Sequence, residues 1–581
     1  MLTALLLLAA AGCTSEAESG GGESTEGDTT VEEAQTTDDT EPDEDDSAAD
    51  AEAEEPEELA EPEEPADESP HGGAYGVSAG DPAAVDVGIE ILEDGGTAVD
   101  AAVAVAFAMS VVEPFASGLG GGGAAVVYHP DEDPAAHDYR DPVPQTGQVP
   151  TGGTGIPGLV AGLEELHATY GSGSFTRLVD PATHLASDGV ETSESLAFWL
   201  RSGGIPVGQL PHLYPGGAPL AEGDEVVQED LADTLRRIAT GGREAFYEGA
   251  LGADLAERVA AIDTESLAAY EVAHHEPPVG EFAGHQVISS APPLAGATLI
   301  QYLQIAEAMG VEDHEPGSAD FIHTVATAWR ISEQHLNWEI ADPAFVDVPI
   351  DELTDQGMNA ALAEQADMSS VVGIDPAQPH GGVERPDGNT THITVIDSEG
   401  MMVSMTNTLS NFWGSGEYAL GFFLNDQLTN FDARTGSPNP PPEAGKRIVG
   451  SSAPAIVLDA EGRPVLGLGS PGGPRIPNIL AQVLIRWAMH DHDLAAAVEA
   501  PRQHGVGARL MFEDMPSNDV RSDLANRGHP GFEVPSFRYY FGSVQALEVD
   551  YDAQEVFGAA DPRREGAWRV DTPAQVSDAA D

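Results

Sequence analysis

Two adjacent threonines, Thr390 and Thr391, stand directly before a run of apolar and β-branched residues at 393–396. This placement is unusual because it puts hydroxyl groups at the start of a core strand rather than in a solvated loop. A threonine hydroxyl is a weak nucleophile at neutral pH and needs a base within hydrogen-bond reach. A threonine at a chain terminus carries such a base in its own α-amine, whose pKa is about 8. Thr390 would therefore become an activated nucleophile if the chain were cut just before it.

The bond between Asn389 and Thr390 is the predicted cleavage site. Attack of the Thr390 hydroxyl on the preceding carbonyl would give an ester, and water would open that ester to leave two chains. The same hydroxyl would then serve in cleavage and in later catalysis. A pair of threonines at a strand start is also a common structural feature, in which the hydroxyls serve only the packing of the strand.

The segments around these threonines predict an α/β fold. Residues 393–396 and 402–406 flank a turn at 397–400, which predicts a hairpin. Strands are also predicted at 74–78, 421–424, 455–458 and 465–468. Helices are predicted from Pro82 to the glycines at 95–96, at 98–112 and 160–170, at 231–240 before the glycines at 241–242, and at 479–489. Helices that flank stacked sheets are the natural arrangement of these elements.

The charge of the chain is extreme, with 100 acidic against 23 basic residues and a net charge of −77. Residues 14–70 hold 25 of the acidic residues, no Lys or Arg and almost no large apolar residue, which predicts a disordered acidic linker. The remainder is still strongly acidic and Lys446 is its only lysine, so we hypothesise a salt-loving source. Nucleic-acid binding is excluded because it needs clustered basic residues.

The N-terminus carries a short apolar run at residues 2–11 that ends in Ala10, Ala11, Gly12 and Cys13. The run is too short to span a bilayer and predicts a signal peptide at residues 1–13. Its end resembles a bacterial lipobox, in which Cys13 would be lipidated and would anchor the protein to the cell surface. The alternative is plain secretion without an anchor, and any membrane contact is predicted to be through this anchor alone.

Several ordered motifs between His71 and His504 resemble the γ-glutamyltransferase family, also called γ-glutamyl transpeptidase or glutathione hydrolase. They lie at residues 91–102, 112–114, 117–122, 138–141, 290–293, 406–408 and 469–473. The resemblance implies an N-terminal-nucleophile hydrolase with an αββα sandwich, cleaved from one precursor into a large chain, 71–389, and a small chain, 390–581. The implied reaction passes a γ-glutamyl group from glutathione or a similar amide to water or to an amino-acid or peptide amine. No metal or cofactor is implied, and the histidines show no metal-ligand spacing.

The resemblance also assigns roles to individual residues. Thr390 would be the nucleophile, and the hydroxyl of Thr408 would orient it. The amides of Gly472 and Gly473 would form the oxyanion hole. Arg140 would grip the α-carboxylate of the substrate, a task suited to a planar guanidinium.

The resemblance implies five further substrate-binding positions, and three of them depart from the family pattern. Gln427 and Ser451 agree with it, whereas Ser410, Asn430 and Gly450 stand where the family usually has Asn, Asp and Ser. An asparagine at position 430 keeps the shape of an aspartate but loses the charge that would pair with the substrate's α-ammonium. This change leaves two alternatives open: a glutaryl-type acylase with relaxed recognition of the α-amine, and a non-catalytic surface lipoprotein that keeps the fold.

Overall fold

A computed structural model describes residues 71–203, 205–371, 388–431, 437–507 and 509–571 of the chain. All of them belong to the compact unit Pro65–Asp581. The predicted signal peptide, Cys13 and the acidic linker at 14–70 lie outside the described residues. Among the described helices, none has both the length and the apolar character needed to cross a bilayer.

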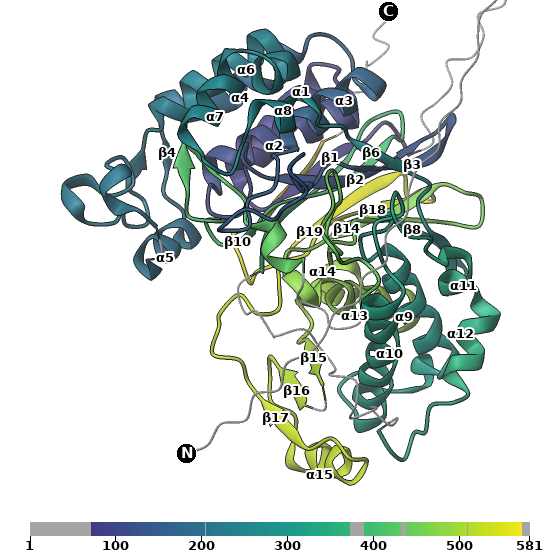
Figure 1. Ribbon diagram of the computed structural model, residues 1–581. Helices are drawn as coiled ribbons and strands as arrows, with labels where there is room; N and C mark the ends of the chain where they lie inside the picture. The colour runs from purple at the N-terminus through teal and green to yellow at the C-terminus, as the bar shows by residue number, and fades with distance from the viewer. Residues whose placement is uncertain (1–70, 204, 372–387, 432–436, 508, 572–581) are drawn as a thin grey trace, which may run out of the picture. The chain divides into compact units, whose positions relative to one another are not determined.

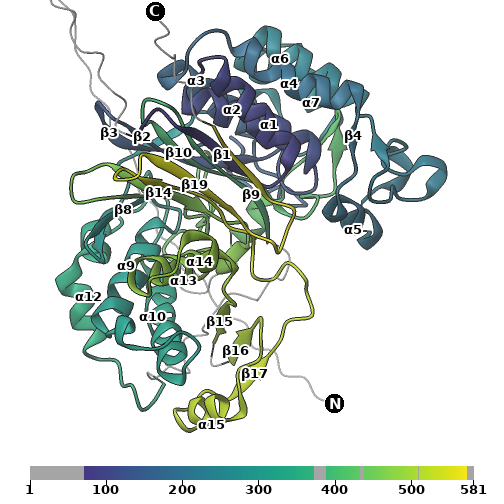
Figure 2. The same cartoon turned by 180° about the vertical axis from the view of Figure 1, so that it is seen from behind.

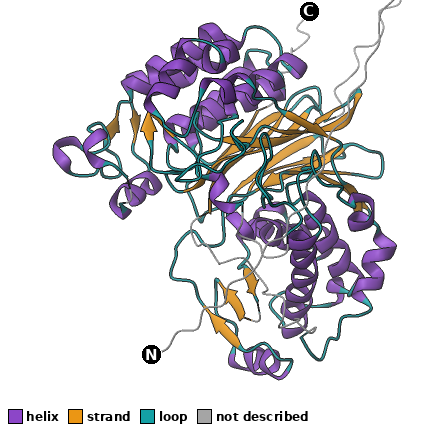
Figure 3. Cartoon of the chain, in the orientation of Figure 1, coloured by secondary structure: helices purple, strands orange, loops and turns teal. Residues whose placement is uncertain are grey.

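Two β-sheets form the centre of the described unit, as Figure 3 shows in orange. The first has the strand order β20-β1-β9-β10-β2-β3-β6, and the second has the order β19-β18-β14-β13-β8-β7. The strands of the first sheet are β1 (Tyr75–Ala79), β2 (Gly122–His129), β3 (Glu132–Asp138), β6 (Ala273–His275), β9 (Gly388–Ile396), β10 (Met402–Asn411) and β20 (Ala567–Asp571). Those of the second are β7 (Val279–Phe282), β8 (His285–Ser289), β13 (Ala455–Leu458), β14 (Pro464–Gly469), β18 (Gln545–Asp550) and β19 (Glu555–Ala560). Apolar side chains from both sheets, among them Val126, Met402, Ile456 and Leu547, form one buried cluster between them.

Helices cover the outer face of each sheet, and Figures 1 and 2 show the two helical layers on opposite sides of the strands. The layer on the first sheet contains α1 (Pro82–Glu93), α2 (Ala98–Val112), α3 (Leu159–Tyr170), α4 (Phe175–Asp188), α6 (Glu229–Tyr247), α7 (Ala250–Arg258) and α8 (Thr264–Ala268). The layer on the second sheet contains α9 (Gly296–Ala308), α10 (Ala319–Trp338), α11 (Ile350–Thr354), α12 (Gln356–Ala363), α13 (Ile476–Met489) and α14 (Leu494–Glu499). The predicted αββα sandwich is therefore confirmed.

Smaller elements lie outside these four layers (Figure 1). They are β4 (Val190–Glu191), α5 (Glu194–Ser202), β5 (Glu225–Val226), β11 (Tyr418–Ala419), β12 (Phe422–Phe423), β15 (Gln503–Val506), β16 (Arg509–Phe512), α15 (Asn518–Asn526) and β17 (Gly531–Glu533). Among them, β15 matters for function because it supplies one wall of the cavity described below.

The first two helices form where local sequence signals place them. The Asp81 side chain accepts a hydrogen bond of 2.8 Å from the Ala83 N–H at the start of α1, and Pro82 occupies the first helical position. Helix α2 begins with a capping box between Thr97 and Asp100 and is buried along its whole length. Its nearly all-round apolar composition suits this central position, as predicted for a core helix rather than a membrane span.

The predicted end of this helix at the glycines 241–242 is confirmed by a break inside α6, and a second helical segment follows the break. The segment runs to Tyr247, although Gly242 leaves the helical region with φ 50° and ψ −144°. The Glu164 carboxylate accepts a hydrogen bond from the Arg243 N–H just after this kink. The helical path resumes because this bond satisfies the backbone and because Phe246 and Tyr247 enter the core.

The predicted hairpin is confirmed as β9 and β10, which are central strands of the first sheet. The register runs regularly from Ile396 opposite Met402 to Thr391 opposite Asn407, and it then shifts before Asn389 pairs with Ser410. Ser410 has a positive φ of 81° at this irregularity. The bond between Asn389 and Thr390 therefore lies where the ladder changes register.

His392, on β9, makes the stability of the fold sensitive to acid. It is buried between the sheets, hydrogen-bonded to the hydroxyls of Thr406 and Thr394, and burial lowers its pKa to about 3. A histidine whose pKa is lower in the folded than in the unfolded state gives stability that is present above pH 6.5 and lost as the pH falls. We expect wild-type protein to lose about 2 kcal/mol more unfolding free energy than His392→Asn between pH 6.5 and 4.5. Urea titrations across this range measure the difference, and parallel curves for the two proteins would contradict it.

Candidate active site

A cavity of about 160 Å³ brings most of the predicted site residues together. The predicted residues that line it are Arg140, Thr390, Thr408, Ser410, Gln427, Asn430, Gly450, Ser451 and Gly473. Gly472 is buried directly before Gly473 but is not part of the lining. Asn389 belongs to β9, and its side chain lies outside the described residues. The fold therefore brings residues that are far apart in the sequence to one cavity.

Thr390 and Thr408 form the hydroxyl pair of the cavity. The Thr390 Oγ1 donates a hydrogen bond of 3.3 Å to the Thr408 Oγ1, which also accepts one of 2.8 Å from the Ser410 N–H. Both threonines are almost fully buried. The two hydroxyls therefore contact each other beside the register shift of the hairpin.

The Thr390 backbone is held by a residue that the sequence did not indicate. The Arg564 Nη1 donates a hydrogen bond of 3.3 Å to the Thr390 carbonyl, and Arg564 is electrostatically coupled to buried Glu113. Burial raises the pKa of Glu113 to about 7, although the Arg564 charge opposes this rise. Arg564 lies in a part of the chain without a distinct local pattern, so only the tertiary structure reveals this contact.

The loop after β14 contains the two predicted oxyanion glycines. Gly472 and Gly473 have φ values of 145° and 57°, in the region that favours glycine. The Ser470 Oγ accepts a hydrogen bond of 3.1 Å from the Ser543 N–H and so fixes the start of the loop. The short helix that begins at Gly473 contacts β9, which carries Thr390. Consecutive glycines in such conformations can direct backbone N–H groups toward an anion.

Arg140 is held rigidly at the cavity wall by a buried carboxylate. Its Nε and Nη2 donate to Asp138 at 3.0 and 2.6 Å, and its Nη1 donates to the Ile448 carbonyl at 3.1 Å. Burial would raise the pKa of Asp138, but Arg140 and Arg447 together lower it below its ordinary value. A guanidinium has five N–H groups, and these bonds use three of them. Arg140 therefore brings a buried positive charge to the cavity wall.

The altered substrate positions also lie in the cavity. The Asn430 Nδ2 donates a hydrogen bond of 3.1 Å to the Ser410 Oγ, so these two substitutions contact each other. A Cβ atom on Gly450 would lie 2.7 Å from the Arg140 Nη1. Gly450 therefore allows the guanidinium to occupy its observed position, and a serine there would require Arg140 to shift.

The remaining cavity wall comes from residues that sequence reasoning missed. They are contributed mainly by α10, β15 and two loops, and include Trp329, Glu333, Asn337, Arg475, His504 and Tyr540. The Arg475 guanidinium lies over the Tyr540 ring at 4.4 Å from its centre. These residues lie in no recognisable sequence motif, because only the packing of distant elements brings them to the same cavity.

The chain matches the family described as Gamma-glutamyltranspeptidase over residues 84–570, which is most of its length. It belongs to this family. Its members are enzymes of the N-terminal-nucleophile hydrolase class, so the hydroxyl pair, the glycine loop and the arginine lie in the fold expected for that chemistry.

Similar proteins include two that are named as proenzymes. The Capsule biosynthesis protein CapD proenzyme of Bacillus anthracis is 35% identical over 500 residues, covering 86% of this chain and 91% of that protein. The Glutathione hydrolase proenzyme of Escherichia coli K12 is 32% identical over 529 residues, covering 84% and 90%. A solved structure of cephalosporin acylase from Bacillus halodurans has a TM-score of 0.76 at 22% identity, covering 86% of this chain and 96% of that one. At that identity it supports the fold alone.

Proposed function

We propose that this chain is a self-processing γ-glutamyltransferase and glutathione hydrolase. The observation that carries the proposal is the Thr390 hydroxyl, bonded to Thr408 in a cavity that also contains the buried cation Arg140. A nucleophile and an anion-binding group in one small hollow suit an acyl donor that carries a carboxylate. The two relatives named as proenzymes support a precursor that is cut into two chains.

The first step of the proposed mechanism is self-cleavage. The Thr390 Oγ attacks the Asn389 carbonyl carbon, the peptide C–N bond breaks, and the hydroxyl proton passes to the departing nitrogen, which becomes the α-amine of Thr390. Water then hydrolyses the ester, leaving a carboxylate on residue 389 and a free Thr390 hydroxyl. The products are a large chain of residues 71–389, together with any preceding residues that remain attached, and a small chain of residues 390–581.

In turnover, the Thr390 amine takes the proton from the hydroxyl as the oxygen attacks the γ-carbonyl of the donor. The N–H groups of Gly472 and Gly473 stabilise the oxyanion, and the amine passes the proton to the leaving amine. Arg140 binds the α-carboxylate of the γ-glutamyl group. Water or an acceptor amine then attacks the acyl ester and restores the hydroxyl.

A glutaryl-type acylase is the second candidate, and Asn430 is the observation that favours it. Asn430 has no negative charge to pair with an α-ammonium, and its amide donates to Ser410. A glutaryl group keeps the carboxylate for Arg140 and lacks the amine. Retention of Thr390, Thr408 and the glycine loop supports either enzyme over a non-catalytic surface protein.

Hydrolysis of γ-glutamyl and glutaryl p-nitroanilides by the purified protein tests the proposed function. We expect a higher kcat/KM for the γ-glutamyl substrate, and about a fivefold or greater further gain in Asn430→Asp because the restored carboxylate would pair with the α-ammonium. Gln427→Glu provides a control that adds the same charge elsewhere in the cavity. A wild-type preference for the glutaryl substrate would replace the first candidate with the second.

The location of the protein is a separate proposal. We propose that the N-terminal apolar run directs export and that Cys13 anchors the protein at the cell surface, with the acidic linker as a spacer. Labelling of cells with a radioactive fatty acid, in wild type and Cys13→Ser, would test the anchor.

A further inference from the structure

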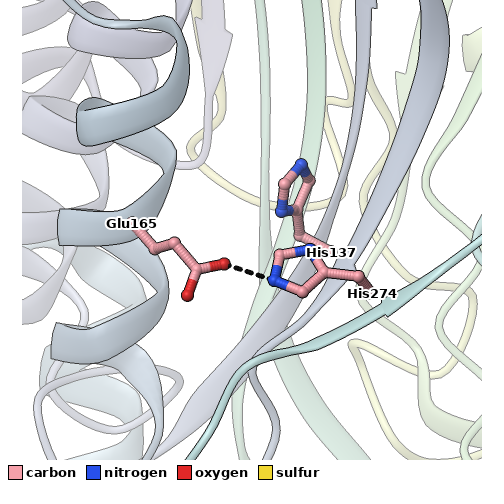
Figure 4. A group of neighbouring side chains, drawn as sticks. All are labelled: His137, Glu165 and His274. Atoms are coloured by element: carbon pink, nitrogen blue, oxygen red, sulfur yellow. Dashed lines mark ion pairs between the residues drawn. The ribbon is translucent and has the colours of Figure 1, made fainter.

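Two histidines and a glutamate gather on the first sheet, outside the cavity. His137 comes from β3, His274 from β6 and Glu165 from α3, and one potential ligand atom of each lies within 4.8 Å of the others. Figure 4 shows the Glu165 carboxylate and both imidazole rings directed toward one another, with an ion pair between Glu165 and His274. Neither histidine nor the glutamate takes part in the mechanism proposed above.

The backbone explains why these side chains meet. His137 and His274 are direct partners in the antiparallel pairing of β3 with β6, so both side chains project from the same face of the sheet. Helix α3 covers this part of the sheet through its contacts with β2, and Glu165 projects from it toward the histidines. No local spacing in the sequence marks the group, since each member comes from a different element.

The chemistry of the three groups is that of a metal site. The His137 Nε2 lies 3.3 Å from the Tyr170 hydroxyl, whereas its Nδ1 is buried and has no hydrogen-bond partner. The His274 Nε2 lies 2.7 Å from the Glu165 Oε1. A hydrogen bond on one ring nitrogen of a ligating histidine commonly fixes which nitrogen faces the metal. Tyr170 would hold His137 in this way, with Nδ1 directed toward the ion.

We propose that His137, Glu165 and His274 bind a divalent first-row transition cation, for which zinc is the representative probe. Two imidazoles and one carboxylate are a ligand set used by zinc, with water completing a four-coordinate shell. In a tetrahedral zinc site, neighbouring ligand atoms lie about 3.4 Å apart. On zinc binding, the 2.7 Å distance between the Glu165 Oε1 and the His274 Nε2 would therefore lengthen slightly, and the longer distances within the group would shorten. The strongly acidic chain also favours cation binding over anion binding.

The proposed ion would tie three elements together at the edge of the sheet. Strand β6 is the edge strand, and β3 leads directly through Asp138 to Arg140. A cation bound by β3, β6 and α3 together would hold these three elements in place. It would stabilise the folded chain, because the three ligands come together only in the folded state.

Calorimetric titration of the full, chelator-treated protein with zinc chloride tests the proposal, with excess magnesium present to occupy carboxylates on the acidic surface. We expect one zinc ion per chain at this site and at least tenfold weaker binding in His274→Ala and in Glu165→Gln. His275→Ala is the matched control, because His275 is on the same strand but projects from the opposite face. Its zinc affinity should equal that of the wild type.

Two further measurements distinguish a specific metal site from adventitious zinc binding. Zinc should raise the melting temperature of the wild type and of His275→Ala by several degrees, and should leave that of His274→Ala unchanged. Cobalt(II) bound to the wild type should show the visible absorption of an ion with nitrogen and oxygen ligands. This absorption should be absent in Glu165→Gln. Equal zinc affinity and equal thermal shifts in all variants would overturn the proposal.

Discussion

Thr390→Ala should leave the chain uncut and without amide-hydrolase activity. The substitution removes the hydroxyl that is proposed to attack the Asn389 carbonyl and later the donor, while the methyl side chain fits the same buried position. We expect a loss of at least about 10³-fold in kcat/KM, because removing a nucleophile removes the covalent path. Denaturing electrophoresis should show one band in the variant and two in the wild type, and N-terminal sequencing of the smaller band should begin at Thr390.

Two control variants make this result specific. Thr390→Ser keeps a hydroxyl at the same position and should still be cut, at a reduced rate. Thr391→Ala removes the neighbouring hydroxyl and should still be cut and active. A wild-type chain that remains uncut in low and high salt, or a Thr390→Ala chain that is cut normally, would contradict the assignment of Thr390 as the nucleophile.

Arg140→Lys should raise KM for a γ-glutamyl anilide and lower kcat/KM about 100-fold. The lysine keeps the positive charge but cannot bind Asp138 through two nitrogens and present further N–H groups to a carboxylate. The substituted protein should fold, because Arg447 also lies 3.6 Å from Asp138 and compensates its buried charge. Steady-state kinetics with the anilide and with its α-amide, which lacks the carboxylate, measure the effect.

The comparison of substrates isolates the role of Arg140. The wild type should prefer the substrate with the α-carboxylate, and Arg140→Lys should lose most of that preference. Arg447→Lys provides the control, because Arg447 is buried against the same aspartate but does not line the cavity. An equal loss for both substrates would show that Arg140 supports the structure without binding the carboxylate.

Much of the fold could be predicted, because the helix and strand signals in the sequence agree with the burial of these segments in the structure. The cap at Asp81, the largely apolar helix α2 and the β9–β10 hairpin all appear in the structure where the sequence placed them. The break at Gly242 was predicted, but the helical segment after it was not, because that segment depends on a hydrogen bond to Glu164 from another helix. Helix and strand signals therefore identified the layers, whereas a tertiary contact accounts for the helical segment that follows Gly242.

The candidate site was predictable only where motifs mark it. Thr390, Thr408, Arg140 and Gly473 lie in short patterns, and the structure brings them to one cavity. Arg564, which binds the Thr390 carbonyl, lies in no such pattern. Its contact joins residues 174 positions apart, and a hydrogen bond over that separation leaves no periodicity or spacing in the sequence.

The strand order of the two sheets has a consequence for the proposed cleavage. The predicted small chain contributes β9, β10 and β20 to the first sheet, where β9 and β10 lie between β1 and β2 of the large chain. In the second sheet, β13 of the small chain pairs with β8 of the large chain. The cut would therefore produce two interleaved polypeptides that share both sheets and the helical layer on the second sheet. Such a heterodimer cannot dissociate by simple dilution, since separation would require the unfolding of both partners.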